Sequence, residues 1–158
     1  MPTITLPDGK ALSFDAAVSI LDIAAKIGKR LAKDALAGEI DGEMKDLSFL
    51  VARDAKIRII TPTTPEGLKL MRHSAAHVMA EAICALFPGT KLAYGPPVED
   101  GFFYDLDSPT PISADDLPKI EDEMQKIVKE AHAVARSVKS RDAAVAFFTG
   151  IGEHYKAE

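Results

Sequence analysis

The chain has 158 residues, of which 47% are apolar and 27% are charged, and its net charge is −5. These proportions are typical of a globular protein and exclude a disordered tail, and no apolar stretch approaches the ~18 residues that cross a bilayer. The single cysteine, Cys84, cannot form an internal disulfide and fits a reducing compartment. The first residues lack the basic and apolar regions of a secretory signal. We therefore expect a soluble cytoplasmic protein without membrane contact.

Residues 1–61 predict a small α+β domain. Apolar residues alternate on either side of Asp8-Gly9 and of Asp41-Gly42. Both pairs predict hairpins, because Asp-Gly accepts the positive φ of a tight turn. Ser19 can cap a helix, and the β-branched residues 56–61 predict a final strand. This order of elements is that of a β-grasp, ubiquitin-like domain.

The helix after Ser19 carries an apolar stripe and is predicted to end at Gly28. Four cations lie around this end: Lys26, Lys29, Arg30 and Lys33. They could form a local patch for RNA in a chain whose overall charge is not that of a nucleic-acid-binding protein. A solvated helix face is the simpler explanation and the one that we favour, but the sequence leaves both interpretations open.

Prolines at both ends of residues 62–65 predict a linker, and residues 62–158 then predict a second α+β unit with long helices. Its first helix is expected at 66–87, with an apolar stripe that includes Met71, Ala75, Val78 and Ala82. The further expected elements are strands at 91–94, 102–106 and 134–139, helices from Asp115 and after Ser140, and an unstructured tail at 153–158.

Two histidines, His73 and His77, lie four residues apart in the first of these helices. This spacing places both imidazoles on one face, which we expect to be exposed and opposite the apolar stripe. Two ligands are too few for a zinc site, and Ser74 stands where a metalloprotease needs glutamate, so we expect no metal here. The pair could contact a substrate, and a purely structural role stays open at this point.

Residues 95–105 combine two glycines, two prolines, adjacent carboxylates and three aromatics. Gly95 and Gly101 permit backbone geometries that other residues resist, and the prolines stiffen the segment. Such a composition suits a wall that lies close against a ligand. The alternative is a tight corner between strands that buries Phe102 or Phe103 in the core.

These motifs resemble the N-terminal region of bacterial threonyl-tRNA synthetases. Residues 1–61 resemble the β-grasp domain called TGS, and residues 62–158 resemble the first part of the family's editing domain. The segments that carry the resemblance to the editing domain are Arg72-His73-Ser74-Ala75-Ala76-His77, Gly95-Pro96-Pro97-Val98-Glu99-Asp100-Gly101-Phe102-Phe103-Tyr104-Asp105 and Tyr155-Lys156.

The resemblance implies a part in hydrolysing tRNA-Thr that has been mischarged with serine. By this resemblance, His73 contacts the terminal ribose hydroxyls, His77 lines the same face, and Lys156 positions water or the developing charge. The remaining implied residues of the pocket, which would seat the seryl-adenosine end, are Gly95, Tyr104 and Asp105.

The family's Cys-x-x-x-His segment, aminoacylation core and anticodon-binding domain have no counterpart in these residues. The resemblance therefore implies a portion of a threonine-tRNA ligase that is inactive alone, with ATP, Mg²⁺ and Zn²⁺ belonging to the absent core. The implied partners are the acceptor end of tRNA-Thr, the rest of the synthetase and a second copy in a homodimer. The alternative is a non-catalytic TGS module that binds tRNA or regulates another enzyme.

Overall fold

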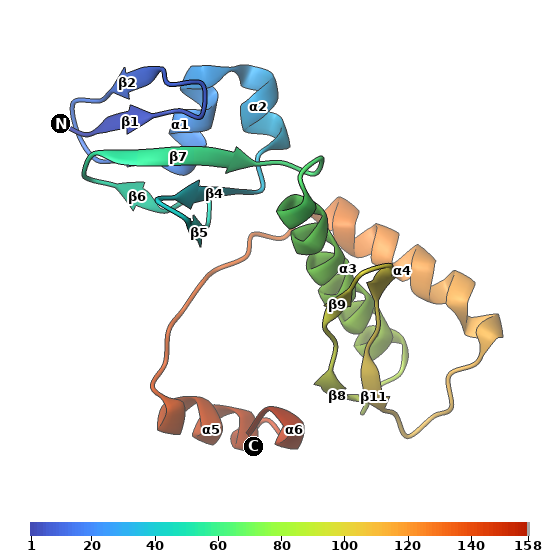
Figure 1. Ribbon diagram of the computed structural model, residues 1–158. Coiled ribbons are helices and arrows are strands. Elements are labelled where there is room, and N and C mark those ends of the chain that lie inside the picture. The colour runs from blue at the N-terminus through green and yellow to red at the C-terminus, as the bar shows by residue number, and fades with distance from the viewer. Residues whose placement is uncertain (158) are drawn as a thin grey trace. The chain divides into compact units, whose positions relative to one another are not determined.

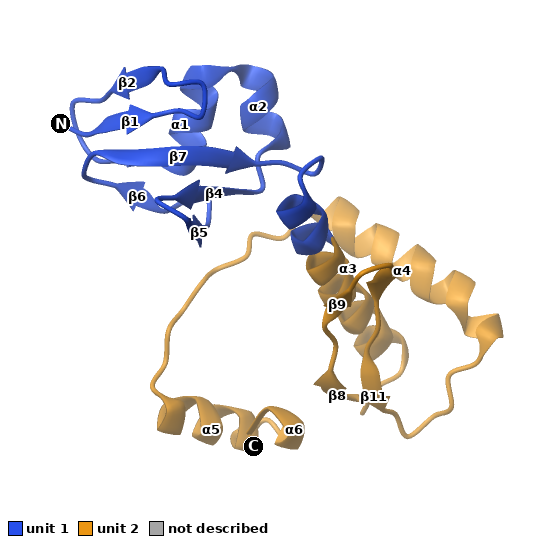
Figure 2. Cartoon of the chain, viewed as in Figure 1, with its two compact units in different colours: residues 1–71 blue, residues 72–158 orange. Residues whose placement is uncertain are grey.

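The computed structural model describes residues 1–157 and has an α+β architecture, as the sequence predicts (Figure 1). The chain forms two compact units, Met1–Met71 and Arg72–Glu158 (Figure 2). The division falls within a helix, later than the segment 62–65 where the sequence suggests a linker. Each unit is described by itself.

The first unit is built on a five-stranded sheet in the order β2-β1-β7-β4-β5. Strand β1 pairs antiparallel with β2 and parallel with β7, and β4 pairs antiparallel with both β7 and β5. The strands are β1 (Thr3–Thr5), β2 (Ala11–Ser13), β4 (Ala37–Ile40), β5 (Glu43–Lys45) and β7 (Ala55–Ile60). A separate antiparallel pair, β3 (Val18–Ser19) and β6 (Leu50–Val51), was not expected from the sequence, because two-residue strands are too short to show a period.

Both predicted hairpins are confirmed, and their turns have the expected backbone geometry. Gly9 has φ +83°, and Asp41 and Gly42 have φ +49° and +90°. Positive φ at two successive residues is the signature of the turn whose twist matches paired strands. The register across the second turn, Ile40 opposite Glu43, follows directly from this geometry.

Helix α1 (Ile20–Ile27) begins and ends where the sequence predicts. The Ser19 hydroxyl accepts a hydrogen bond from the Asp22 amide, and the Gly28 amide donates to the Ala24 carbonyl. A second helix, α2 (Lys29–Asp34), follows at once and was missed. Its six residues contain only one large apolar side chain, Leu31, so no apolar stripe predicts this helix.

The core of this unit lies where α1 meets the sheet. Ile4, Ile20 and Ile23 are fully buried there, together with Ile40 and Ile57 from the sheet. Helix and sheet are so close that a Cβ on Gly38 of β4 would lie 2.7 Å from Cγ2 of Ile20. Hydrophobic burial by a few isoleucines therefore stabilises this small unit.

We predict that Ile23→Ala lowers the free energy of unfolding of this unit by about 2–5 kcal/mol, because it deletes a fully buried side chain and leaves a cavity. Leu21→Ala on the same helix is the matched control. Its side chain is 43% exposed, so its cost should stay below about 1 kcal/mol. Denaturant unfolding measures both, and equal costs would contradict this account of the core.

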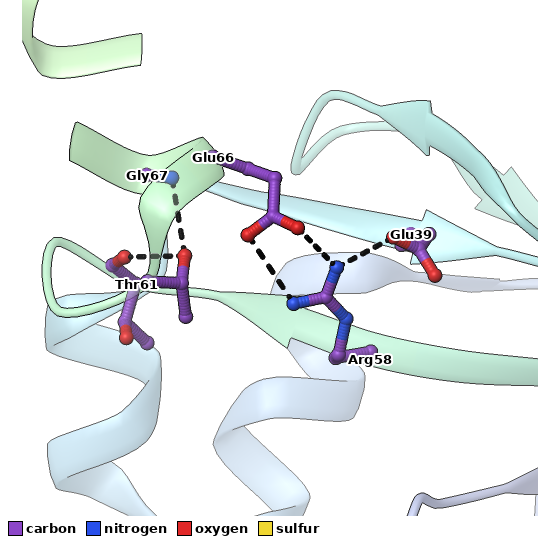
Figure 3. A network of polar contacts seen from close by, with 6 residues as sticks. Glu39, Arg58, Thr61, Glu66 and Gly67 are labelled. Carbon is purple, nitrogen blue, oxygen red and sulfur yellow. Dashed lines mark hydrogen bonds and ion pairs between the residues drawn. The ribbon is translucent and has the colours of Figure 1, made fainter. Parts of the chain in front are cut away.

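The junction after β7 is an ordered polar network (Figure 3). The Arg58 guanidinium contacts Glu39 of β4 at 2.6 Å and Glu66 of α3 at 2.9 Å. These carboxylates raise the pKa of Arg58, and its hydrogen bonds lower the pKa of Glu66. Both partners therefore remain charged near neutral pH, and Arg58 ties the first turn of α3 to the sheet.

The residues between β7 and α3 (Pro65–Leu86) cap this helix. The Thr64 hydroxyl donates to the Thr61 carbonyl and accepts from the Gly67 amide, at 3.0 and 3.1 Å. A Cβ on Gly67 would lie 1.9 Å from the Thr61 oxygen, so the close approach requires glycine. The prolines at 62 and 65 thus flank a hydrogen-bonded helix cap.

The second unit packs two helices and short strands around a small core. Ala82 and Ile83 of α3 are buried against Ile120 of α4 (Leu117–Glu130), with Leu106 of β11 packed beside them. The strands are β8 (Lys91–Tyr94), which pairs antiparallel with β11 (Asp105–Asp107), and β9 (Pro97–Val98), which pairs antiparallel with β10 (Gly101–Phe102). The strand expected at 102–106 is therefore split in two.

The phase of α3 differs in detail from the predicted stripe. Ala76, Ala80 and Ile83 form its buried face with Ala82, whereas Met71 is 46% exposed. The stripe of Met71, Ala75, Val78 and Ala82 was therefore partly wrong. Sequence periodicity favours large apolar residues, but the buried face here includes alanines, which let neighbouring elements come close.

Three further elements complete this unit. The 3₁₀ turn Ala114–Asp116 carries a capping box with Ser113 and leads into α4, and Ser140 caps α5 (Arg141–Gly150) as predicted. The tail expected to be unstructured instead contains α6 (His154–Ala157), which packs against β8. That expectation was wrong because a four-residue helix depends on tertiary contact rather than on its own propensity.

The strand predicted at 134–139 does not form. This segment is extended and exposed, with Val134 99% and Val138 76% accessible. A β-strand requires a neighbour for its amides and carbonyls, and no such neighbour pairs with it among residues 1–157. Its β-branched residues fit a strand, but propensity alone cannot provide the partner.

We predict that limited trypsin digestion first cuts after Arg136 or Lys139. A protease needs an extended, accessible segment, and these residues lie in one, whereas Arg58 and Lys69 lie in hydrogen-bonded elements. The double variant Arg136→Gln/Lys139→Gln should slow the first cut severalfold, as followed by mass spectrometry. A first cut at Arg58 or Lys69 would show that the junction around residues 62–65 opens more readily.

Candidate functional site

The two histidines of α3 form a hydrogen-bonded pair on an exposed side of the helix, as expected. Their Nε2 atoms are 3.0 Å apart, and the rings meet edge to face with centroids 4.6 Å apart. In such a contact one Nε2–H donates and the other Nε2 accepts, and which ring donates depends on the tautomers. The spacing of i and i+4 on a helix makes this contact possible.

His77 sits in an electrostatic environment that disfavours its protonation. Partial burial lowers the pKa of His77 below its ordinary 6.5, and nearby His73 and Lys156 lower it further. His77 is therefore predominantly neutral at pH 7. A neutral imidazole can accept a proton or a hydrogen bond from water or from a hydroxyl group, which is the ability that a general base needs.

Lys156 is held in this neighbourhood by α6. Its Nζ lies 3.7 Å from Glu153, which also pairs with Lys91 of β8 at 3.5 Å. The hydroxyl of Tyr155 donates to Asp107 of β11 at 3.1 Å. These contacts anchor the helix to the strand pair β8–β11, and so they give Lys156 a defined place.

The structure also brings together two of the three residues expected to seat a ligand. A Cβ on Gly95 would lie 2.4 Å from Cδ2 of Tyr104, so the tyrosine ring packs directly on the glycine. Asp105 is exposed and lies opposite Tyr94 in the β8–β11 ladder. No hydrogen bond joins Gly95, Tyr104 or Asp105 to the histidines within residues 1–157.

The aromatic residues of this segment do not fill the core. Phe102 is partly buried, and Phe103 is 43% exposed and meets Tyr94 edge to face at 6.4 Å. Neither belongs to the buried cluster around Ile83 and Ile120. The interpretation of a corner that buries these phenylalanines is therefore not supported.

Sequence reasoning gave no role to Arg72, which precedes His73. Its Nη1 donates to the carbonyls of Val98, at 3.3 Å, and of Glu99. An arginine beside a histidine motif is a weak signal, because nothing in a sequence shows a partner that lies 26 residues away. Only the fold reveals that contact.

No group of three or more His, Cys, Asp or Glu side chains that could hold a metal ion occurs in the described part of the chain. His73 and His77 provide two nitrogen donors, whereas a structural zinc site takes four ligands. The donor set does not fit such a site, and we assign no metal to it.

The cations at the end of α1 have contacts of their own. Lys26 lies over the Phe14 ring at 4.8 Å, and Arg30 pairs with Asp34 at 3.8 Å. These contacts are typical of a solvated helix face.

None of the helices within residues 1–157 has the length and apolar character to span a membrane.

Comparison with known proteins identifies the first unit and relates the whole chain to one enzyme. A TGS domain matches residues 2–61. The whole chain is 54% identical to a threonine--tRNA ligase of Paramagnetospirillum magneticum, and 48% identical to those of an Azoarcus species and Coxiella burnetii. It is homologous to the N-terminal quarter of these ligases. The chain thus covers 24–25% of the length of these curated relatives.

The homology covers both units and every motif that suggested it. The match to the TGS domain ends at residue 61, just before the cap of α3. The histidine pair, the segment around Gly95 and Tyr104, and Lys156 all lie beyond it, in the part that matches the ligases alone. The candidate site therefore belongs to the second unit.

We predict that the pKa of His77, measured by NMR titration, lies below 6.5. Lys156→Gln removes a positive charge that disfavours protonation, so it should raise this pKa. Because burial is the largest cause, the value should still remain below 6.5. Lys26→Gln in the first unit is the matched control and should leave it unchanged. A pKa of 6.5 or more in the unaltered chain would contradict the electrostatic description of the site.

The lowered pKa of His77 also makes the free energy of unfolding depend on pH. Below pH 6.5 the unfolded chain binds a proton at His77 that the folded chain resists, so the free energy of unfolding decreases as the pH falls through this value. The decrease ends once the pH is below the folded-state pKa.

Proposed function

We propose that this chain is the N-terminal portion of a threonine-tRNA ligase and that its second unit contributes to editing. In this proposal, editing is the hydrolysis of seryl-tRNA-Thr, the product of a mistaken aminoacylation. The observation that carries the proposal is the exposed His73–His77 pair beside the positive charge of Lys156, in a region homologous to these ligases.

The chemistry explains why such a site is needed. Serine has the hydroxyl group of threonine and lacks only one methyl group, a difference worth roughly 1–3 kcal/mol in binding. This is too little for accurate translation, so a second site has to remove serine after transfer. A pocket that admits serine and excludes threonine supplies the missing discrimination.

In the proposed reaction, water attacks the carbonyl carbon of the ester between serine and the terminal ribose. Water loses a proton as it attacks, and a tetrahedral intermediate forms. Its oxyanion collapses, the ester bond breaks, and a proton is returned to the leaving ribose oxygen, which gives free serine and a ribose hydroxyl. The neutral His77 can accept a hydrogen bond from the incoming water, and His73 can contact the ribose hydroxyls. The ammonium of Lys156 can stabilise the oxyanion or orient the water.

The segment around Gly95, Tyr104 and Asp105 would seat the seryl-adenosine end. Tyr104 presents an aromatic ring that packs on the Gly95 backbone, and aromatic rings stack well on nucleobases. Replacing Gly95 by a larger residue would displace this ring. We therefore assign Gly95 to the support of Tyr104, and we assign Asp105 to the polar edge of the pocket.

The remaining partners follow from the homology and belong to the proposal. The acceptor end of tRNA-Thr would bring the substrate, and the rest of the synthetase would supply aminoacylation with ATP, Mg²⁺ and Zn²⁺. The complete ligase would be a cytoplasmic homodimer. Residues 1–158 alone would hydrolyse seryl-tRNA slowly, because exposed histidines and an exposed ammonium act in water, where electrostatic stabilisation is weak.

The test is His73→Ala in a full-length ligase that carries this chain. We expect seryl-tRNA hydrolysis to fall by on the order of a hundredfold or more, the usual effect of losing an acid–base or positioning group, with threonine activation unchanged. Glu130→Ala, which removes an exposed carboxylate beside His132 on the second unit, is the matched control. Deacylation assays and ATP–pyrophosphate exchange measure the two activities.

Equal losses of both activities would indicate a structural role for His73 and would contradict editing. An unchanged deacylation rate would instead favour the non-catalytic module that binds tRNA or regulates another enzyme. Residues 1–158 alone should deacylate seryl-tRNA far more slowly than the full-length ligase, and comparable rates would show that the chain suffices.

A further inference from the structure

The hairpin formed by β9 and β10 is poorly supported by its own contacts. Each strand has two residues, and the pair forms a separate two-stranded sheet. Its turn, which includes Glu99 and Asp100, is exposed, as is Val98. A two-stranded hairpin of this size is marginal in water without an anchor.

Arg72 supplies that anchor. Its Nη1 donates to the Val98 carbonyl at 3.3 Å and also to the Glu99 carbonyl. These are the only side-chain hydrogen bonds between α3 and the hairpin within residues 1–157. The acceptors are backbone oxygens at the point where the chain turns, so the contact fixes the position of the turn itself.

The anchor links the two parts of the proposed editing site. On α3, Arg72 directly precedes His73, whose imidazole pairs with His77. On the other side, Val98 and Glu99 lie between Gly95 and Tyr104, in the segment proposed to seat the substrate. No other side-chain hydrogen bond in the described chain ties this segment to the helix that carries the histidines.

We propose that Arg72 is a positioning residue that holds the Val98–Glu99 turn against α3 and so sets the opening of the editing pocket beside His73. This inference rests on the proposed function. It has two consequences. Without Arg72 the Val98–Glu99 turn moves away from α3, so seryl-tRNA binds less tightly and threonyl-tRNA is excluded less strictly.

The guanidinium group suits this task better than an ammonium group. It is planar and permanently charged, and the two N–H bonds of its Nη1 lie in one plane at a fixed angle, so this single nitrogen donates to both neighbouring carbonyls. Lysine at this position keeps the charge but not this planar arrangement of donors. The two substitutions Arg72→Lys and Arg72→Gln therefore separate the charge from the geometry.

The first measurement concerns the anchor alone and uses residues 1–158. Hydrogen exchange of the Gly101 amide, which lies opposite Val98 in the hairpin, should increase on the order of tenfold in Arg72→Gln, because the charge-assisted hydrogen bonds to Val98 and Glu99 are lost. The amides of Asp105–Asp107 serve as an internal reference and should change little. Arg136→Gln, in the exposed segment, is the matched control. Unchanged exchange in Arg72→Gln would overturn the anchor.

The second measurement uses the full-length ligase. Arg72→Gln should raise KM for seryl-tRNA hydrolysis on the order of tenfold and change kcat by less than about threefold, because the reacting groups remain in place. Hydrolysis of correctly charged threonyl-tRNA should rise relative to the unaltered enzyme. The KM and the ester preference of Arg72→Lys should lie between those of Arg72→Gln and the unaltered enzyme. Arg136→Gln should match the unaltered enzyme in both. A merely structural role would not shift the preference between seryl and threonyl esters.

The outcomes separate this inference from the proposed function. Loss of hydrolysis in His73→Ala with normal KM and selectivity in Arg72→Gln would overturn the role of Arg72 and leave editing intact. Normal hydrolysis in His73→Ala would overturn both. If Arg72→Gln unfolds, as circular dichroism would show, Arg72→Lys decides the question by the same KM and selectivity criteria.

Discussion

The period of helix α3 is the constraint on which the second unit depends. With 3.6 residues per turn, the same helix buries Ala76, Ala80 and Ile83 against its neighbours and presents His73 and His77 on an exposed side. The buried residues hold α4 and β11 in place, whereas the exposed ones form the candidate site. A change of phase would therefore expose the buried residues and turn the two histidines toward the core.

The beginning of this helix is fixed by polar contacts in the first unit. Arg58 joins Glu39 of the sheet to Glu66 of the helix, while Thr64 caps the first turn. Each of these half-buried ion pairs contributes modestly by itself, but the two share one guanidinium and act with a helix cap and a glycine that permits close approach. Within the first unit, the end of β7 and the first turn of α3 are thus joined by an ordered polar network.

Two short elements that are distant in the sequence, α6 and the β9–β10 turn, are held near the candidate site by side-chain contacts. Helix α6 brings Lys156 to the electrostatic neighbourhood of His77, and the contacts Glu153–Lys91 and Tyr155–Asp107 anchor that helix on strands β8 and β11. In the same way, the hydrogen bond from Arg72 to Val98 anchors the turn between β9 and β10. In both cases one or two side chains fix a short element that would not be stable alone.

The sequence by itself determined the elements with strong local signals: the Asp-Gly hairpins, the Ser19 and Ser140 caps, the long helix and the i, i+4 pairing of His73 with His77. It also carried the resemblance to threonyl-tRNA synthetases, because that depends on residue types and spacing. Three features were decided by tertiary structure alone. Residues 134–139 do not pair as a strand, α6 forms, and Arg72 reaches Val98 and Glu99. The physical reason is that caps, turns and helical periods are local interactions, whereas strand pairing, the docking of a four-residue helix and a contact across 26 residues need partners that are distant in the chain.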